Sequence, residues 1–595
     1  MKVKSLYILI VSLALISCAN RGMGPQGGPK DSIPPVALKS EPELGALEFK
    51  GKRIEITFNE HLQLNDLGNN LLMSPPQQNP PDVKARGKKL VVQFQDTLLD
   101  NTTYTIDFGS AVCDYTEKNP IHGFYFYFST GTEIDTLEWV GRVFDAENLN
   151  PLSGISVGIH SNLSDTAFVR HTFLRMAKTD TAGMFRISNI HPGTYRLYAV
   201  NDISRDYRLT IGEALAFADD PIPVYHAPSD SDSLHLSTMF LFSESQQKLY
   251  MQRMLRDQQH CVQLLFSSSP DSVPRWRVMR PSEVDSTRND STWIDPSPYI
   301  FTRYSKHLDT VSLWLTDSIA ILQDTLYLET RYRRTDSLYN LEWCTDTLRA
   351  VYRAPKLNSK AKEAKEREER NRRLTLKTNA RKNFEIYDTL RLTCATPIAS
   401  ILLDSIRIVE KVDTGYRKIP FTIAPYDTLP MELLFLAALK EGKQYELRMD
   451  SGTLHDVYGT THVKANYPLQ VKTKEDYSTL RVTLIPFVPK ARIQVLNAKD
   501  QVVRELPANA AGTLFEYLKP DAYYMRLYID ENGDGKWTTG SWERKRQPEP
   551  VYYNPNKIQT KANWDFEEEW NYTAVPQTQA KPAELIKASA AKKKK

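Results

Sequence analysis

The chain has 595 residues, enough for about four domains. Its 76 Lys and Arg residues nearly balance 72 Asp and Glu residues, and four of the lysines form the C-terminal run 592–595. This balance argues against a nucleic-acid-binding protein, because such proteins concentrate basic charge on one face. Thirty tyrosines, together with many β-branched residues and frequent turns, predict β-domains along the chain.

Residues 1–17 have the organisation of a secretory signal peptide. Lys2 and Lys4 precede an apolar stretch that is too short to cross a bilayer. The stretch ends in Leu-Ile-Ser-Cys, which looks like a lipobox with Cys18 as the lipidated residue. We therefore expect cleavage before Cys18 and covalent lipid on its sulfur. An ordinary signal peptide followed by a chance cysteine is the alternative.

Residues 18–35 form a Gly- and Pro-rich tether after the lipidated cysteine. A tether of this length and composition spans on the order of 20–25 Å, which keeps the first domain close to the membrane. Ala19 is not the aspartate that retains many lipoproteins in the inner membrane, so we expect an outer-membrane protein. The following Asn20-Arg21-Gly22 lacks the acidic residues of many surface lipoproteins, which slightly favours the periplasmic face over the cell surface.

Residues 36–133 contain strands in which apolar and polar residues alternate, as at Ile54, Ile56 and Phe58. An opening Pro-Pro, an Asn-Thr-Thr turn before Tyr104 and a final Phe-Ser-Thr-Gly strand follow in order. With these features the segment resembles the bacterial Ig-like domain of S-layer and other envelope proteins. The resemblance implies a β-sandwich that serves as a scaffold.

Residues 136–242 change in character. They contain Gly-Arg-Val-Phe-Asp at 141–145, Pro-Leu-Ser-Gly at 151–154 and Pro-Gly-Thr-Tyr at 192–195. In this order the motifs resemble the carboxypeptidase regulatory-like, or transthyretin-like, β-sandwich. The resemblance implies a non-catalytic domain.

The middle of the chain is predicted to contain two helical segments around a β-domain. Residues 243–260 are predicted to form an amphipathic helix, because Leu249 and Met254 share one helical face. Residues 261–354 are predicted to be a β-domain punctuated by Asp-Thr and Asp-Ser turns. Residues 355–379 carry charged i,i+4 pairs without an apolar stripe, which predicts a solvated charged helix or linker; a docking helix is the alternative.

Residues 380–474 repeat the first Ig-like pattern in weaker form, with Tyr445 in the place of Tyr104. Residues 475–571 are predicted to be a C-terminal β-domain with an acidic loop, and residues 572–595 a disordered tail. The predicted fold class is therefore mainly β. It consists of tandem Ig-like and transthyretin-like β-sandwiches with one amphipathic helix and one charged helix or linker.

Two acidic loops occupy equivalent places in segments that align without a gap. The second loop has oxygen-bearing side chains at positions 1, 3 and 5 and glycine at position 6, and so resembles an EF-hand calcium loop. Its candidate calcium ligands are Asp530, Asn532, Asp534, the carbonyl of Lys536, and Glu543. The weaker candidate metal loop consists of Asp202, Ser204, Asp206 and Glu213.

Neither loop matches the calcium pattern completely. Ser541 stands at position 12 of the second loop, where a bidentate carboxylate is required, and Tyr207 replaces the glycine of the first. A polar turn closed by its own side-chain-to-backbone hydrogen bonds is the alternative for each loop. Calcium in either loop would be structural.

No constellation in the sequence indicates an enzyme. The Gly-x-Ser-x-Gly match at 154–158 continues as an alternating strand, whereas a nucleophile elbow requires a helix there. The four cysteines after Cys18 are widely spaced, which disfavours zinc. Buried unpaired thiols are the expected state of these cysteines; one or two disulfides are the alternative.

The whole chain resembles the Bacteroidota outer-membrane lipoproteins that carry Ig-like and regulatory-like domains. The resemblance implies a lipid-anchored scaffold or interaction subunit with envelope-protein partners, as part of an outer-membrane assembly or transport machine. Nine Trp and thirty Tyr residues leave open a surface glycan-binding or adhesion lipoprotein.

Overall fold

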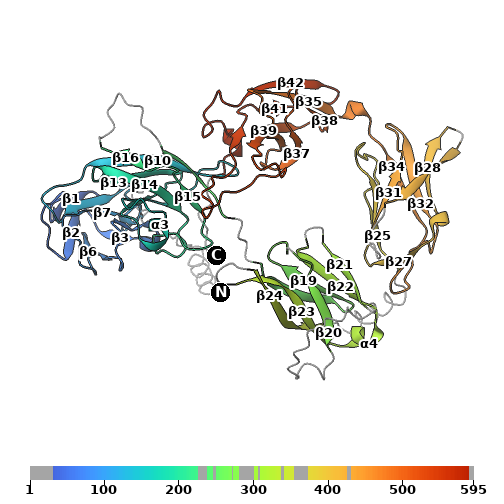
Figure 1. Ribbon diagram of the computed structural model, residues 1–595, viewed down its shortest axis with the longest axis horizontal. Coiled ribbons are helices and arrows are strands. Elements are labelled where there is room, and N and C mark those ends of the chain that lie inside the picture. The colour runs from blue at the N-terminus through green and yellow to red at the C-terminus, as the bar shows by residue number, and fades with distance from the viewer. Residues whose placement is uncertain are drawn as a thin grey trace, which may run out of the picture. The chain divides into compact units, whose positions relative to one another are not determined.

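The computed structural model describes residues 31–225, 237–244, 249–270, 272–279, 300–305, 308–336, 341–353, 373–413, 415–424 and 431–587. The protein is mainly β, with 49% strand and 4% helix (Figure 1). The chain divides into two compact units. Unit 1 comprises Met1–Phe144 and Pro151–Leu241, and unit 2 comprises Asp145–Asn150 and Phe242–Lys595.

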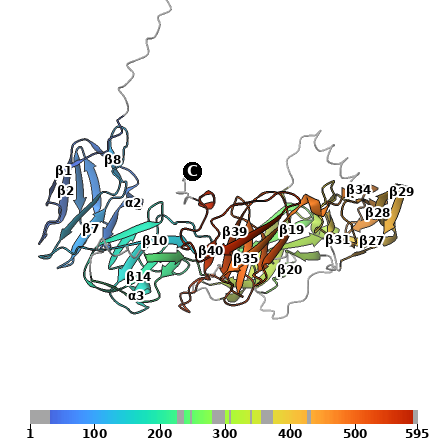
Figure 2. The ribbon, with the colours of Figure 1, turned by 90° about the horizontal axis from the view of Figure 1, so that it is seen from above.

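The first domain of unit 1 is an Ig-like sandwich (Figure 2). Its strands are β1 (Ala37–Glu41), β2 (Arg53–Phe58), β3 (Leu62–Leu64), β4 (Leu72–Ser74), β5 (Asp82–Arg86), β6 (Lys89–Gln93), β7 (Thr103–Asp107), β8 (Val112–Asp114) and β9 (Tyr125–Ser129), with the short helix α2 (Leu67–Asn70). One sheet has the order β1-β2-β6-β5, a second has β4-β7-β9, and β3 pairs with β8. The predicted alternation is confirmed, because Ile54, Ile56 and Phe58 all lie in the core.

The second domain of unit 1 has sheets β13-β10-β17 and β12-β11-β14-β15, with β16 also paired to β14. Its elements are β10 (Leu137–Asp145), β11 (Ser156–His160), α3 (Ala167–Arg170), β12 (Arg175–Lys178), β13 (Met184–Ile190), β14 (Gly193–Val200), β15 (Leu215–Phe217), β16 (Ile222–Val224) and β17 (Ser237–Leu241). Residues 156–158 belong to a strand paired on both sides, which confirms that the Gly-x-Ser-x-Gly match is no nucleophile elbow.

The third domain corrects the predicted amphipathic helix at 243–260. Its elements are β18 (Met251–Gln258), β19 (Cys261–Phe266), β20 (Arg275–Met279), β21 (Ile300–Tyr304), β22 (Thr310–Leu315), α4 (Ser318–Leu322), β23 (Thr325–Thr335) and β24 (Leu341–Val351). β18 pairs with β19, and its register shifts twice, between Met251 and Arg253 and between Leu255 and Gln258. These bulges break the period-two alternation of a strand, which is why the apolar residues imitated a helical spacing.

The fourth domain repeats the strand order of the first Ig-like domain. Its elements are β25 (Leu376–Thr378), β26 (Leu390–Cys394), β27 (Ile398–Ile401), η2 (Leu403–Ser405), β28 (Ile406–Val412), β29 (Gly415–Ile419), β30 (Phe421–Ile423), β31 (Glu432–Ala437), β32 (Gln444–Met449), β33 (Leu454–Asp456) and β34 (Ala465–Gln470). The sheet β25-β26-β31-β30 matches β1-β2-β6-β5, and β28-β32-β34 matches β4-β7-β9.

The start of this domain corrects the end of the predicted charged segment at 355–379. Leu374 is buried in the core of the second Ig-like domain, and β25 follows directly, so the sandwich already includes 374–379. Burying apolar surface stabilises the fold, so Leu374 joins the core although charged residues precede it. The charged residues 355–372 lie outside the described residues.

The C-terminal domain has the sheets β38-β35-β42 and β37-β36-β39-β40, with β41 also paired to β39. Its elements are η3 (Lys474–Asp476), β35 (Ser478–Ile485), β36 (Ala491–Leu496), β37 (Val502–Pro507), β38 (Thr513–Leu518), β39 (Ala522–Ile529), β40 (Val551–Tyr553), β41 (Ile558–Gln559), β42 (Asp565–Asn571) and η4 (Ala583–Leu585). The arrangement matches that of the second domain, strand for strand in the larger sheet. The internal repeat therefore extends over a whole domain.

The predicted disordered tail at 572–595 is wrong for residues 572–587, which are folded. Ala580 and Leu585 are buried, and Lys581 Nζ lies 2.9 Å from Asp500 Oδ2. The Pro/Ala/Lys composition suggested disorder, but a few buried side chains and one paired charge hold the segment. The last residues, 588–595, lie outside the described residues.

All four cysteines after Cys18 are buried and unpaired, as expected: Cys113, Cys261, Cys344 and Cys394. Burial raises the pKa of the Cys261 and Cys394 thiols to about 12, so both stay protonated. They contribute as small apolar side chains.

Candidate functional site: two acidic loops and the joint of unit 1

Each acidic loop begins where a central strand ends, β14 in one domain and β39 in the other. A buried tyrosine near the start of each strand makes the same local contact. Tyr195 Oη donates to the carbonyl of His191 at 2.6 Å, and Tyr523 Oη donates to the carbonyl of Lys519 at 2.9 Å. The repeated contact fixes the strand in the same way in both domains, so the loops leave their sheets from equivalent places.

The first loop is closed by two carboxylates that accept backbone hydrogen bonds. Asp202 accepts from the amides of Asp206 and Tyr207 at 3.2 and 3.1 Å. The buried Glu213 accepts from the amides of Ile203, Ser204 and Thr210 at 2.8, 3.0 and 3.2 Å. Charge-assisted bonds of this kind are about twice as strong as neutral ones, so they hold the loop in shape.

The second loop uses the same arrangement. Asp530 accepts from the amides of Gly533 and Gly535 at 2.7 and 2.9 Å, and both glycines have φ near +75°. A buried glutamate completes the loop, because Glu549 accepts from the amides of Glu531 and Thr538 at 2.9 and 2.8 Å. Burial raises the pKa of Glu549, although these amides oppose the shift.

The second carboxylate of this loop was missed from the sequence. The calcium pattern directs attention to position 12 and its neighbours, and so to Glu543, whereas Glu549 folds back from the residues before β40. The gapless alignment did not reveal it, because Glu213 and Glu549 stand at different distances from their aspartates. The two glutamates are equivalent only in the folded loops, where each accepts hydrogen bonds from backbone amides.

The calcium hypothesis stays a prediction. The side chains of the second loop bind one another: Asn532 Nδ2 donates to Asp534 Oδ2 at 3.1 Å and to Thr538 Oγ1 at 2.7 Å. Asp534 also accepts from the amide of Lys536 at 2.7 Å. Within the described residues, no three His, Cys, Asp or Glu side chains are grouped so as to hold a metal ion. A cation would thus compete with hydrogen bonds already made.

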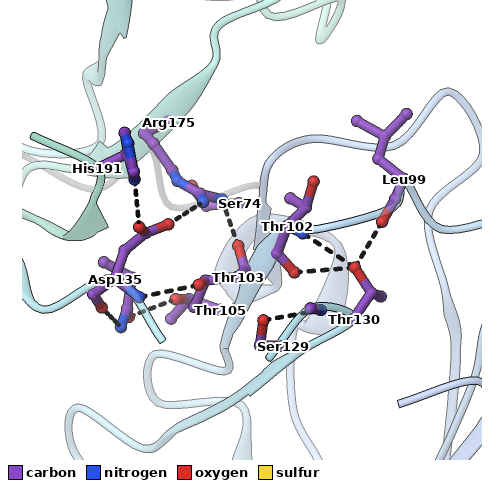
Figure 3. Close-up of polar contacts among 12 residues, drawn as sticks. Ser74, Leu99, Thr102, Thr103, Thr105, Ser129, Thr130, Asp135, Arg175 and His191 are labelled. Carbon is purple, nitrogen blue, oxygen red and sulfur yellow. Dashed lines mark hydrogen bonds and ion pairs between the residues drawn. The ribbon is translucent and has the colours of Figure 1, made fainter. Parts of the chain in front are cut away.

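The sequence also gave no sign of the polar joint between the two domains of unit 1. Arg175, on β12, is buried; it donates to the carbonyl of Thr103 on β7 and lies 3.4 Å from Asp135. His191 Nδ1 lies 2.9 Å from the other oxygen of Asp135, so this carboxylate lies between the two side chains (Figure 3). Burial lowers the pKa of Arg175, and the negative charge of Asp135 opposes that shift.

Further hydrogen bonds cross the joint around this ion pair. The amide of Met176 donates to Ser74 Oγ at 3.1 Å, and Thr105 Oγ1 donates to Asn189 Oδ1 at 2.8 Å. The other end of the Asn189 amide donates to the carbonyl of Asp135 at 2.7 Å. β4 and β7 of the Ig-like domain thus contact β12 and β13 through matched polar pairs.

A cavity of about 350 Å³ lies at this joint. Its lining comes from both domains: the outward-facing residues of β4 and β7 and the start of β9 on one side, and residues of β10, β12 and β13 on the other. The sequence does not reveal such a cavity, because it exists only where two separately folded domains meet.

The predicted lipidation site, Cys18, lies outside the described residues. No helix among the residues that the structure describes is long and apolar enough to cross a membrane.

Residues 31–130 match the family of bacterial Ig-like domains, which confirms the Ig-like assignment of the first domain. No curated protein matches the chain.

Solved structures similar to this chain include the N-terminal part of the bacterial S-layer protein SbsC, with 14% identity and a TM-score of 0.16, covering 29% of this chain and 44% of that one. A longer form of the same S-layer protein has 10% identity and a TM-score of 0.14, covering 89% and 67%. The major pilin subunit of Bacillus cereus has 8% identity and a TM-score of 0.12, covering 73% and 99%. At this level of similarity, no function is carried over.

Proposed function

We propose that this chain is a non-catalytic lipoprotein, held to the outer membrane by lipid on Cys18, that acts as a scaffold or interaction subunit in an envelope assembly or transport machine. The periplasmic face is the favoured location. The Ig-like match of residues 31–130 supports a scaffold, because such modules carry binding partners on a rigid framework.

The observation that carries the scaffold role is the joint of unit 1. A buried arginine satisfied by a carboxylate and a carbonyl on the neighbouring segments joins two β-domains into one body. Losing either partner of such a buried contact leaves an uncompensated charge, which opposes bending of the joint. A stiff joint keeps partners at a fixed spacing, which a scaffold requires.

Metabolic labelling with a palmitate analogue tests the anchor. The full-length chain should incorporate label, Cys18→Ala should not, and Cys394→Ala, which keeps Cys18, should label normally. Incorporation of label by Cys18→Ala would overturn the lipoprotein proposal.

Protease treatment of intact cells then tests the face of the membrane. A periplasmic subunit is protected until the outer membrane is opened, whereas a surface protein is cleaved at once. Purification from gentle detergent should recover the chain with envelope-protein partners. A chain that is cleaved on intact cells and purifies alone would instead support the surface adhesion alternative.

A further inference from the structure

We infer that the cavity at the joint of unit 1 is a binding site for a neutral saccharide. The cavity lies at the interface of two domains within one compact unit, a common location for ligand sites, and its volume of about 350 Å³ is within the range of small-ligand pockets. This site is independent of the lipid anchor and of the scaffold role.

The lining of the cavity combines apolar and polar residues. Leu72 and Met176 are buried residues that line it, and they offer an apolar surface for the C–H face of a sugar ring. Tyr125 lines the cavity with its side chain largely exposed. An exposed aromatic ring at the edge of a pocket is suited to stacking on such a face.

Asp107, which lines the cavity, has a carboxylate oxygen that is open to a ligand. Asp107 Oδ1 accepts from the amide of Gly109 at 2.8 Å, and the structure gives Oδ2 no hydrogen-bond partner among the described residues. Burial disfavours the charged form of Asp107 and raises its pKa, whereas the amide of Gly109 and the positive charge of Lys178 oppose the shift. A ligand hydroxyl group that donates to Oδ2 would offset the desolvation penalty of the charged carboxylate.

Other lining residues supply hydrogen-bond donors, and a site with both donors and acceptors suits a sugar better than a cation. Ser74 Oγ accepts from Met176, so its own proton is available to a ligand, while Ser188 donates to Glu138 at 3.2 Å and keeps free lone pairs. Arg186 lies 2.7 Å from the same glutamate and lines the cavity with an exposed guanidinium. An ammonium group only donates hydrogen bonds, whereas sugar hydroxyls both donate and accept them. A polyol therefore matches a lining that contains both donors and acceptors.

The test is binding of mono- and disaccharides of neutral hexoses and N-acetylhexosamines to the full chain in detergent, by saturation-transfer NMR and calorimetry. At least one saccharide should bind saturably. Asp107→Asn keeps the bond from Gly109 but removes the charge, and should weaken binding by about tenfold or more, as expected for loss of a charged hydrogen bond. Tyr125→Ala should weaken it too.

Matched controls are Asp82→Asn, on the other sheet of the same domain, and Tyr115→Ala, an exposed tyrosine outside the cavity lining. Both should bind as the unaltered chain does. Melting curves show whether Asp107→Asn and Tyr125→Ala fold as the unaltered chain does.

The proposal is overturned if no saccharide in the panel binds. It is also overturned if binding persists unchanged in both Asp107→Asn and Tyr125→Ala. Binding of cadaverine or a lysine peptide that depends on Asp107, with no saccharide binding, would show a cation site instead.

Discussion

Lys581 Nζ and Asp500 Oδ2 lie 2.9 Å apart, and both side chains are almost fully buried. The pair joins the segment after the last strand to the turn between β36 and β37, so the C-terminal residues are part of the domain. Lys581 also stands over the ring of Tyr553, 4.8 Å from its centre. Desolvated charges of this kind are stable only while both partners are present.

Replacing one partner of this pair should therefore destabilise the C-terminal domain. We expect Asp500→Ala to cost about 3–5 kcal/mol, because Lys581 is left buried without its counter-charge. The measurement is the urea midpoint of the C-terminal transition in the full chain. Lys499→Met, at an exposed neighbour, is the control and should change stability by less than about 0.5 kcal/mol. Equal midpoints for both variants would contradict the finding.

The joint of unit 1 gives a second prediction. Arg175→Met should destabilise unit 1 by several kcal/mol, because it removes an ion pair and a hydrogen bond in a buried place. It should also raise the rate of proteolysis near Asp135, where the two domains meet. Arg186→Met removes an ion pair of an exposed arginine and should cost at most about 1 kcal/mol. Unchanged proteolysis of Arg175→Met would show that the joint does not depend on this residue.

Stability should fall in acid because of His160. This side chain is buried against Phe173 and Tyr198, its Nε2 has no hydrogen-bond partner among the described residues, and burial lowers its pKa to about 4. Between that value and the unfolded pKa of about 6.5, the unfolded chain binds a proton that the folded chain does not. The part of the unfolding free energy that depends on neutral His160 is fully present above pH 6.5 and is lost as the pH falls towards 4.

The size of this effect is about 3 kcal/mol, from the difference between the two pKa values. His160→Leu should flatten the dependence of unfolding free energy on pH between 4 and 6.5. His122→Gln, at an exposed histidine, should leave that dependence as it is. A His160→Leu chain with the original pH slope would mean that another group titrates.

Calcium binding by the second loop is tested by melting the full chain in millimolar calcium and in chelator. We expect calcium to raise the C-terminal transition by an amount equivalent to about 1–3 kcal/mol, and Asp530→Ala with Asp534→Ala to remove the difference. Glu549→Gln should destabilise the loop in both solutions, because it weakens bonds to two amides. Equal transitions in calcium and chelator would leave the loop as a hydrogen-bonded turn.

Much of the fold could be predicted from the sequence, because strands buried on one face alternate clearly, as at Ile54, Ile56 and Phe58. β18 could not, because two bulges displace its apolar residues from that alternation. The carboxylates at the start of the loops were found from their spacing. Glu549, Arg175 and the cavity were not, because their partners are distant in sequence and meet only after folding.

The strand orders repeat along the chain. An Ig-like sandwich followed by a second β-domain, whose larger sheet has the same order in both copies, occurs before and after the middle β-domain. In both Ig-like copies, a buried tyrosine accepts a backbone amide five residues earlier: Tyr104 from Leu99 and Tyr445 from Lys440. The two domains thus recur together as a two-domain cassette with matching sheets. A shortened gene is therefore best cut between cassettes, so that each pair remains intact.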